Sequence, residues 1–167
     1  RRAGGDPLRE AGVTVLFLWA MATTQITFFP LRIIFYDWGG ASNYTPFASI
    51  IQLLTQTNPI VAFENVAGNV LLFVPFGVLM PLLFSRVSGP WAVLWRALAV
   101  SLAIEIVQTL TRARATDVDD VILNVTGAMV GYLVFLGAAW LASKTDAGSR
   151  ALERLRASPP GEPLRAA

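Results

Sequence analysis

Four long apolar stretches follow one another along the chain, each close to the length of a membrane-spanning helix. They run from about Ala11 to Phe29, from about Asn65 to Phe84, from Trp91 to Leu110 and from about Val118 to Ala142. Crossing about 30 Å of hydrocarbon takes roughly 20 apolar residues in a helix. A lipid-exposed backbone must also satisfy its own hydrogen bonds, as a helix does. The pattern therefore predicts an all-α integral membrane protein, a bundle of four spanning helices.

The first stretch has a second interpretation. Arg1, Arg2 and Arg9 precede it, and the small residues of Ala20-Met21-Ala22 resemble the cleavage site of a signal peptide. The apolar character nevertheless continues to Phe29, where a proline stops it. This continuation favours a membrane span over a cleaved leader.

Two segments outside the spans are long: the first connection, Pro30 to Glu64, and the tail after Ser143. In the first connection, a short helix containing Ile50, Ile51, Leu53 and Leu54 is expected to lie along the membrane interface and to cover the outer end of the bundle. Residues 1–10 form a flank, 11–142 the membrane domain and 143–167 a polar tail. The stretch from Arg150 to Arg156 either lies along the inner leaflet or belongs to a flexible end, and the flexible end is favoured.

Composition supports a membrane protein and excludes several kinds of chemistry. Apolar residues make up 54% of the chain and charged residues 14%, whereas soluble domains have about 45 to 50% and about 25%. The chain has no Cys and no His, which excludes thiol nucleophiles, disulfides and imidazole bases. The net charge of +2 gives no broad basic surface, so nucleic acid is not an expected partner. No cofactor and no metal site is predicted.

The distribution of Lys and Arg predicts the orientation. Ten of the thirteen fall on one side of the predicted membrane: Arg1, Arg2, Arg9, Arg86, Arg96, Lys144, Arg150, Arg154, Arg156 and Arg165. Because cytoplasmic segments carry an excess of these residues, both termini are expected in the cytoplasm. The first and third connections would then face outward.

Polar residues within the spans gather at the outward end. They recur at spacings of three and four residues, which places them on one face of each helix. Intramembrane polar groups are costly and commonly functional, so their convergence predicts a small polar pocket open to the outside or to the outer leaflet. The candidate ligand-binding residues are Asn65, Asn69, Glu105, Gln108, Arg112, Arg114, Asp117, Asp120 and Asn124.

Each candidate also has a structural interpretation. Asp117, Asp119 and Asp120 stand where acids stabilise the start of a helix by about 0.3 to 2 kcal/mol. Asn65 or Asn69 could join helices by hydrogen bonds. Glu105 could form an ion pair with Arg112 or Arg114, offsetting the cost of a charge in the span. The coincidence of all these groups at one end favours a pocket.

Gly127 and Gly131 form a face of small residues four apart on the fourth span. Such a face lets another helix approach closely. Oligomerisation through these two glycines is therefore one possibility.

Two gapped motifs carry a family resemblance. Residues 68–77 resemble the signature "GN-x-x-LF-x-PFG" of VanZ-like membrane proteins. Residues 105–132 resemble that family's second signature, "E-x-x-Q … R-x-x-D-x-x-D-x-x-x-N-x-x-G-x-x-x-GY". The resemblance covers about residues 10–142 and implies a small bacterial protein of the cell membrane and envelope. It also implies a possible link to resistance against glycopeptide antibiotics of the teicoplanin type.

Two functions from different classes follow. The first is a binding protein whose pocket engages an amphiphilic or lipid-linked envelope molecule, such as a cell-wall precursor, or a glycopeptide; membrane lipids are the other expected partners. Here Arg112 and Arg114 would meet phosphate or carboxylate, and the amides would supply neutral hydrogen bonds. The alternative is an intramembrane enzyme acting on a lipid phosphate, with Glu105 as general acid or base. Binding is favoured, because no complete catalytic set is visible.

Overall fold

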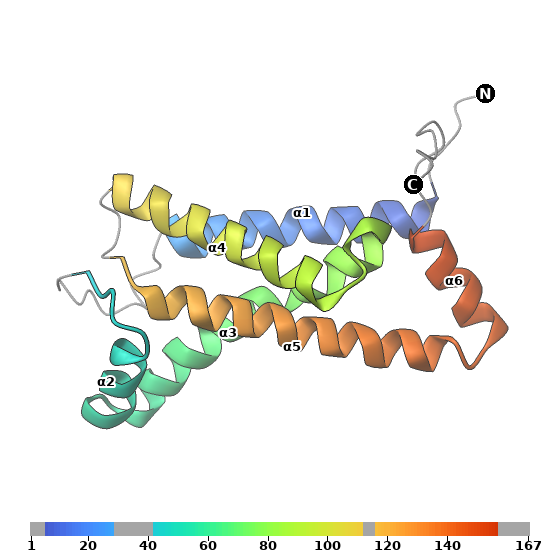
Figure 1. Ribbon diagram of the computed structural model, residues 1–167. Coiled ribbons are helices and arrows are strands. Elements are labelled where there is room, and N and C mark those ends of the chain that lie inside the picture. Colours follow the sequence, from blue (N-terminus) through green and yellow to red (C-terminus); the bar gives the residue numbers. More distant parts are fainter. Residues whose placement is uncertain (1–5, 29–41, 112–115, 157–167) are drawn as a thin grey trace.

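The computed structural model describes residues 6–28, 42–111 and 116–156. This part of the chain is helical, which confirms the predicted all-α class (Figure 1). Its helices are α1 (Pro7–Phe28), α2 (Ala48–Gln56), α3 (Pro59–Leu83), α4 (Pro90–Thr111), α5 (Val118–Ala142) and α6 (Asp146–Arg156), with a short 3₁₀ turn at Ser85–Val87.

Three of these helices, α3, α4 and α5, are long and apolar enough to cross a membrane. Helix α1 has 22 residues, about 33 Å of length, but is more polar. Large apolar side chains point away from the protein on all of them, including Phe17, Leu71, Leu110 and Leu133, which is 64% exposed. An apolar outer surface of this kind suits lipid as the surrounding solvent.

Helix α3 begins at Pro59, six residues before the predicted start of the second span. The side chain of Asn58 caps it by accepting a hydrogen bond from the amide of Ile60 at 2.9 Å. Proline suits the first helical position, because its missing N–H would have no partner there. The helix then continues through Pro75 to Leu83.

Helices α3 and α5 form the closest contact of the bundle, and glycines make it possible. A Cβ added at Gly77 would lie 1.9 Å from the carbonyl oxygen of Ala128. At Gly127 and Gly131 it would lie 2.0 and 2.1 Å from the carbonyl oxygens of Val70 and Val74. The small-residue face predicted for close helix approach is therefore used within the chain. In this structure that face is buried against α3.

Aromatic rings join α1 to this pair. The ring of Trp19 lies 5.8 Å from that of Phe73 and 5.4 Å from that of Phe76. Its indole N–H also donates a hydrogen bond to the carbonyl oxygen of Leu72 at 2.6 Å. Leu72 lies in the turn of α3 before Pro75, next to Leu71, whose carbonyl has no regular helical donor because proline lacks an N–H. Helix α1 is thus fixed at mid-length.

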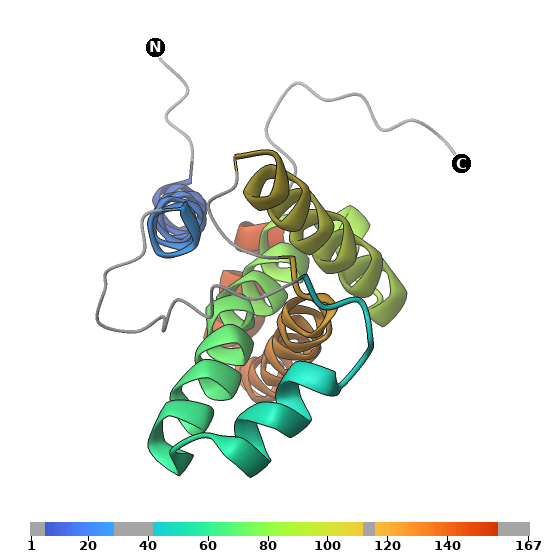
Figure 2. The same cartoon turned by 90° about the vertical axis from the view of Figure 1, so that its left-hand side faces the viewer.

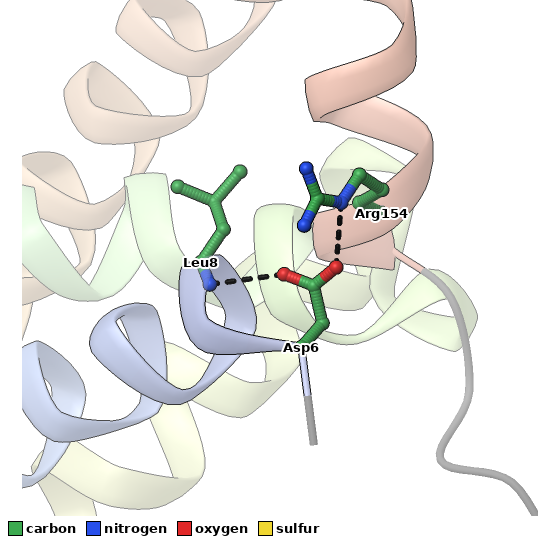
Figure 3. Close-up of polar contacts among 3 residues, drawn as sticks. All are labelled: Asp6, Leu8 and Arg154. Carbon is green, nitrogen blue, oxygen red and sulfur yellow. Dashed lines mark hydrogen bonds and ion pairs between the residues drawn. The ribbon is translucent and has the colours of Figure 1, made fainter. Parts of the chain in front are cut away.

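The predicted flexible tail is instead helical over residues 146–156, in α6. This helix is amphipathic: Leu152 packs against the bundle core, and Leu155 lies near Gly12 of α1. Arg154 forms an ion pair with Asp6 at 2.6 Å (Figure 3). The prediction failed because the apolar face of α6 is covered by α1, α3 and α5, which are distant in sequence.

The carboxylate of Asp6 also accepts a hydrogen bond from the amide of Leu8, capping α1. The hydrogen bond from Arg154 is the main cause that lowers the pKa of Asp6 below its ordinary value of 3.8. A lowered folded-state pKa stabilises the fold at pH values above the ordinary pKa. That contribution is lost as the pH falls through the lowered value.

Helix α2 confirms the short helix expected in the first connection. Ile50 and Leu53 are half-buried, whereas Ile51 and Leu54 are exposed. Viewed from the end of the bundle where α4 finishes and α5 begins, α2 lies beside the first turns of α3 (Figure 2).

Candidate functional site

A polar pocket lies between α1, α3, α4 and α5, near the end where α4 finishes and α5 begins. Its enclosed space is small, about 20 Å³, which is close to the room that one water molecule needs. A wider hollow of about 350 Å³ around it includes the open surroundings. The apolar part of its lining consists of Ile26, Leu72 and Ile104. The polar part consists of Thr27, Asn69, Glu105, Gln108, Asp120 and Asn124. Polar groups from three spanning helices thus meet beside apolar side chains.

Direct hydrogen bonds join the helices around this pocket. The amide of Asn69 on α3 donates to Asp120 Oδ1 on α5 at 2.8 Å. The amide of Asn124, one turn further along α5, donates to Ser101 Oγ on α4 at 2.9 Å. Residues at spacings of four fall on the same helix face, so two successive turns of α5 contribute to the site.

Glu105 and Gln108 bring α4 into the same cluster. Both are almost fully buried, with 6% and 3% exposure. Glu105 Oε2 accepts a hydrogen bond from the backbone N–H of Asp117 at 3.2 Å. Gln108 donates to the carbonyl oxygen of Thr27 at 3.3 Å, which ties the end of α1 to the site.

The aspartates at the start of α5 have three different roles. Asp117 is the N-cap of α5: its Oδ1 accepts the amide of Asp119 at 2.9 Å and the side-chain amide of Asn43 at 2.9 Å. Asp119 is 1% exposed and caps another helix, because its carboxylate accepts the amides of Phe47 and Ile50 at the start of α2. Asp120 alone lines the pocket.

Five predicted site residues come together in the pocket: Asn69, Glu105, Gln108, Asp120 and Asn124. Asn65 does not line it and donates to the carbonyl oxygen of Val61 in its own helix at 2.8 Å. Asp117 likewise lies outside the lining, in the capping role that was the structural alternative. Arg112 and Arg114 lie outside the described residues.

Sequence reasoning missed Asn43, which holds the connection before α2 against the start of α5. Its backbone N–H donates to Thr116 at 2.8 Å, and its carbonyl accepts from Val118 at 3.1 Å. In the sequence, Asn43 only begins the triplet Asn43-Tyr44-Thr45, which matches a glycosylation motif. Its partners are more than 70 residues away, so no local pattern could have revealed the contact.

The lining presents hydrogen-bonding groups, and its carboxylates are not gathered as metal ligands. Within the described ranges, no three Asp or Glu side chains lie close enough to hold one. Carboxylates and amides together present both acceptors and donors. A ligand with hydrogen-bonding groups at one end and an apolar portion at the other would match this lining.

Comparison with known proteins places the chain in a family. The sequence model of the VanZ/LLP1 family matches residues 13–141, which include α3, α4 and most of α1 and α5. The chain belongs to the VanZ/LLP1 family. It is 34% identical over 73 residues to Protein VanZ of Enterococcus faecium. That match covers 44% of this chain and 45% of the relative, so the chain spans about half the length of the curated protein.

This VanZ/LLP1 protein has no match among solved structures. Its pocket residues all fall within the part that matches the family, and the predicted resemblance is confirmed. With membrane-length helices and membership of this family, it is a multi-pass membrane protein.

Proposed function

We propose that this VanZ/LLP1 protein binds the polar head of a lipid-linked or amphiphilic envelope molecule in its pocket. The observation that carries the proposal is the convergence of five polar side chains from α3, α4 and α5 in one pocket. Burying polar groups near lipid costs free energy unless they are satisfied. A site for a ligand explains why so many occur together.

The apolar side chains beside the polar lining support an amphiphile over a wholly soluble ligand. Ile26 and Ile104 come from α1 and α4 and line the same space as Glu105. An acyl or polyprenyl chain would contact such residues, while the head would meet the amides. Arg112 and Arg114, which follow α4 in the sequence, would pair with phosphate or carboxylate on the ligand.

The proposed orientation places the pocket at the outer face of the membrane. The lining residues of α1 and α4 belong to the last turns of these helices and those of α5 to its first turns, while Asn69 and Leu72 lie near the middle of α3. Helix α6 packs against the first turns of α1. The excess of Lys and Arg in the terminal segments favours their location in the cytoplasm. The pocket would then meet molecules of the outer leaflet.

A contribution to teicoplanin-type resistance belongs to the same proposal. It is supported by the similarity to Protein VanZ of Enterococcus faecium. An envelope molecule held at the outer leaflet would be either a lipid-linked wall precursor or the glycopeptide itself.

The test measures binding of a polyprenyl-phosphate lipid to the purified full chain by native mass spectrometry. We expect Glu105→Ala, Asp120→Ala and Asn124→Ala each to weaken binding by about threefold to tenfold, the value of one or two hydrogen bonds. The control is Thr126→Val, because Thr126 is exposed on α5 and bonded to the carbonyl of Ile122 in its own helix. Thermal unfolding of each variant separates lost binding from lost folding.

Unchanged binding in the three folded pocket variants would refute the proposal. Conversion of the lipid by the purified protein, abolished by Glu105→Gln, would replace it with the enzyme alternative. In cells, the same variants should reduce any effect of this protein on teicoplanin susceptibility, while Thr126→Val should not.

A further inference from the structure

Two arginine side chains at the end of the bundle opposite the pocket are half-buried and incompletely hydrogen-bonded. They are Arg9 on α1 and Arg156 on α6. The Nε atom of each is buried and has no hydrogen-bond partner among the described residues. Burying part of a charged group is costly unless that part is paired or hydrogen-bonded, so both side chains require an explanation.

Contacts between α1 and α6 place Arg9 at the junction of these two helices. Asp6 pairs with Arg154 at 2.6 Å (Figure 3), and a Cβ added at Gly12 would lie 3.8 Å from the side chain of Leu155. Arg9 lies midway between Asp6 and Gly12 in height and, at about 100° of rotation per residue, also in angle. Arg9 therefore lies on the side of α1 that faces α6, at what we call the α1–α6 junction.

Arg156 points inward at the same junction from α6. It shares one helix face with Leu152 and Leu155, at spacings of four and one. Leu152 packs against the bundle core, and the guanidinium Cζ of Arg156 lies 6.0 Å from the centroid of the Phe135 ring on α5. An aromatic face attracts a cation but does not replace a carboxylate or phosphate oxygen as a hydrogen-bond acceptor.

The acids at this end do not neutralise the two arginines. Within residues 6–28, 42–111 and 116–156, the ion pair of α6 is made by Arg154, and none joins Arg9 or Arg156 to a carboxylate. Glu10 and Glu153, which lie close to them in the sequence, are exposed. Both guanidinium groups therefore keep N–H donors for an anion that comes from outside the chain.

Exposed tryptophans indicate that this end lies at the membrane surface. Trp91 and Trp95 near the start of α4 and Trp140 near the end of α5 are 69%, 61% and 61% exposed. Indole rings are enriched at the level of the lipid headgroups. Lys144 lies 4.8 Å from the Trp140 ring. Helix α6 crosses this end of the bundle, from the end of α5 to the start of α1 (Figure 1), so the α1–α6 junction lies near the headgroups.

The charge of this end favours an anionic lipid over a zwitterionic one. A guanidinium group binds phosphate through a planar set of donors, often two at a time. Basic residues attract anionic lipids from a membrane surface. In the described chain, the acids at this end are outnumbered by basic residues: Asp6, Glu10, Asp146 and Glu153 against Arg9, Arg86, Arg96, Lys144, Arg150, Arg154 and Arg156.

We infer that the α1–α6 junction binds the phosphate of an anionic phospholipid, with Arg9 and Arg156 as its hydrogen-bond donors. In the proposed orientation, this lipid belongs to the inner leaflet. The inference goes beyond the proposed function, because the site lies at the opposite end from the pocket and does not depend on what the pocket binds.

The experiment measures binding of three probes to the purified full chain in a neutral detergent by native mass spectrometry. The probes are phosphatidylglycerol, phosphatidylcholine with the same acyl chains, and soluble glycerol phosphate. We expect the wild type to bind phosphatidylglycerol about tenfold or more tightly than phosphatidylcholine. Arg9→Gln and Arg156→Gln should each reduce that preference by about threefold to tenfold, since each removes charge-assisted hydrogen bonds.

Matched variants make the result specific. Arg96→Gln removes the same charge at the same end and should retain the preference, because Arg96 is exposed and donates to the carbonyl of Ala92 in its own helix at 3.0 Å. Lysine at position 9 or 156 keeps the charge without the planar set of donors, so Arg9→Lys and Arg156→Lys should lose part of the preference. These lysine variants also provide the test if a glutamine variant does not fold.

Thermal unfolding supplies a second measurement. Without lipid, Arg9→Gln and Arg156→Gln should unfold close to the wild-type temperature, because each replaces a side chain without an ionic partner. Phosphatidylglycerol should raise the unfolding temperature of the wild type more than that of either variant, since a ligand stabilises the state that binds it.

The outcomes distinguish this site from the pocket. Equal binding of the two phospholipids by the wild type would overturn the inference. An equal loss of preference in Arg96→Gln would also overturn it, since general surface charge would then explain the binding. Glycerol phosphate binding as tightly as phosphatidylglycerol would overturn a lipid as the occupant. Glu105→Ala, in the pocket, should leave the preference unchanged, and its loss there would move the lipid to the pocket and overturn the inference.

Discussion

Two neighbouring carboxylates at the start of α5 have different partners, because a shift of one position along a helix turns a side chain toward different surroundings. Asp119 and Asp120 are adjacent, so their side chains project about 100° apart around the helix axis. Asp120 meets Asn69 in the pocket, whereas Asp119 points to the first amides of α2. One acid therefore belongs to the site, and the other holds the element that lies beside it.

Replacing Asp119 should release α2 while leaving the pocket residues in place. In the wild type, two backbone N–H groups donate hydrogen bonds to the Asp119 carboxylate. In Asp119→Asn, the NH₂ group would face one of these donors, so that hydrogen bond would be lost. A hydrogen bond to a charged group is worth about 1.5 to 3 kcal/mol. We expect faster hydrogen exchange across Ala48–Gln56 and an unfolding free energy lower by about 1 to 3 kcal/mol. Asp146→Asn, at an exposed position in the first turn of α6, is the control. Unchanged exchange in α2 would contradict the capping role.

At the scale of elements, the bundle is organised by one close crossing. The backbones of α3 and α5 touch where Gly77, Gly127 and Gly131 meet facing carbonyls. Between apolar helices in lipid, such packing supplies stabilisation that the hydrophobic effect does not. The same crossing holds Asn69 opposite Asp120, so the geometry of the pocket depends on it.

Adding a methyl group at this crossing should therefore separate the helices. Gly131→Ala would place its Cβ 2.1 Å from the carbonyl oxygen of Val74, so the backbone must move. We expect a loss of about 2 kcal/mol or more of stability, measured by thermal unfolding in detergent. Gly137→Ala is the matched control, because nothing lies within 4 Å of its added Cβ. This control should gain up to about 1 kcal/mol from helix propensity. Equal effects of the two changes would refute the packing argument.

At the scale of the whole molecule, the two ends of the bundle differ in chemistry. The end that holds the pocket gathers carboxylates and amides, while the opposite end carries α6 with Arg150, Arg154 and Arg156. Helix α6 joins this end to the start of α1 through the Asp6–Arg154 ion pair (Figure 3). The asymmetry gives the proposed orientation its physical basis.

Cysteine labelling tests that orientation directly, because the chain contains no cysteine. Thr45→Cys and Ala147→Cys place single thiols at exposed positions near opposite ends. In intact cells, a membrane-impermeant maleimide should label Thr45→Cys, whereas Ala147→Cys should react only after permeabilisation. The reverse pattern would place the pocket at the cytoplasmic face and contradict the proposed encounter with outer-leaflet molecules.

Much of the site was predictable because helix geometry is local. Steps of three and four residues fix which side chains share a face, so the polar stripes containing Asn69, Glu105 and Asn124 could be read directly. The lengths of the apolar stretches likewise predicted the ends of the long helices to within six residues. The short helix in the first connection followed from its apolar periodicity.

Other features depended on partners distant in the chain. The sequence by itself determined the all-helical membrane architecture, the family and most of the pocket lining. Only the tertiary structure decided that Asp119 caps α2, that the glycine face is covered by α3 and that α6 is docked. The physical reason is that periodicity fixes the face on which a side chain lies, whereas its neighbour across that face is set by how whole helices pack.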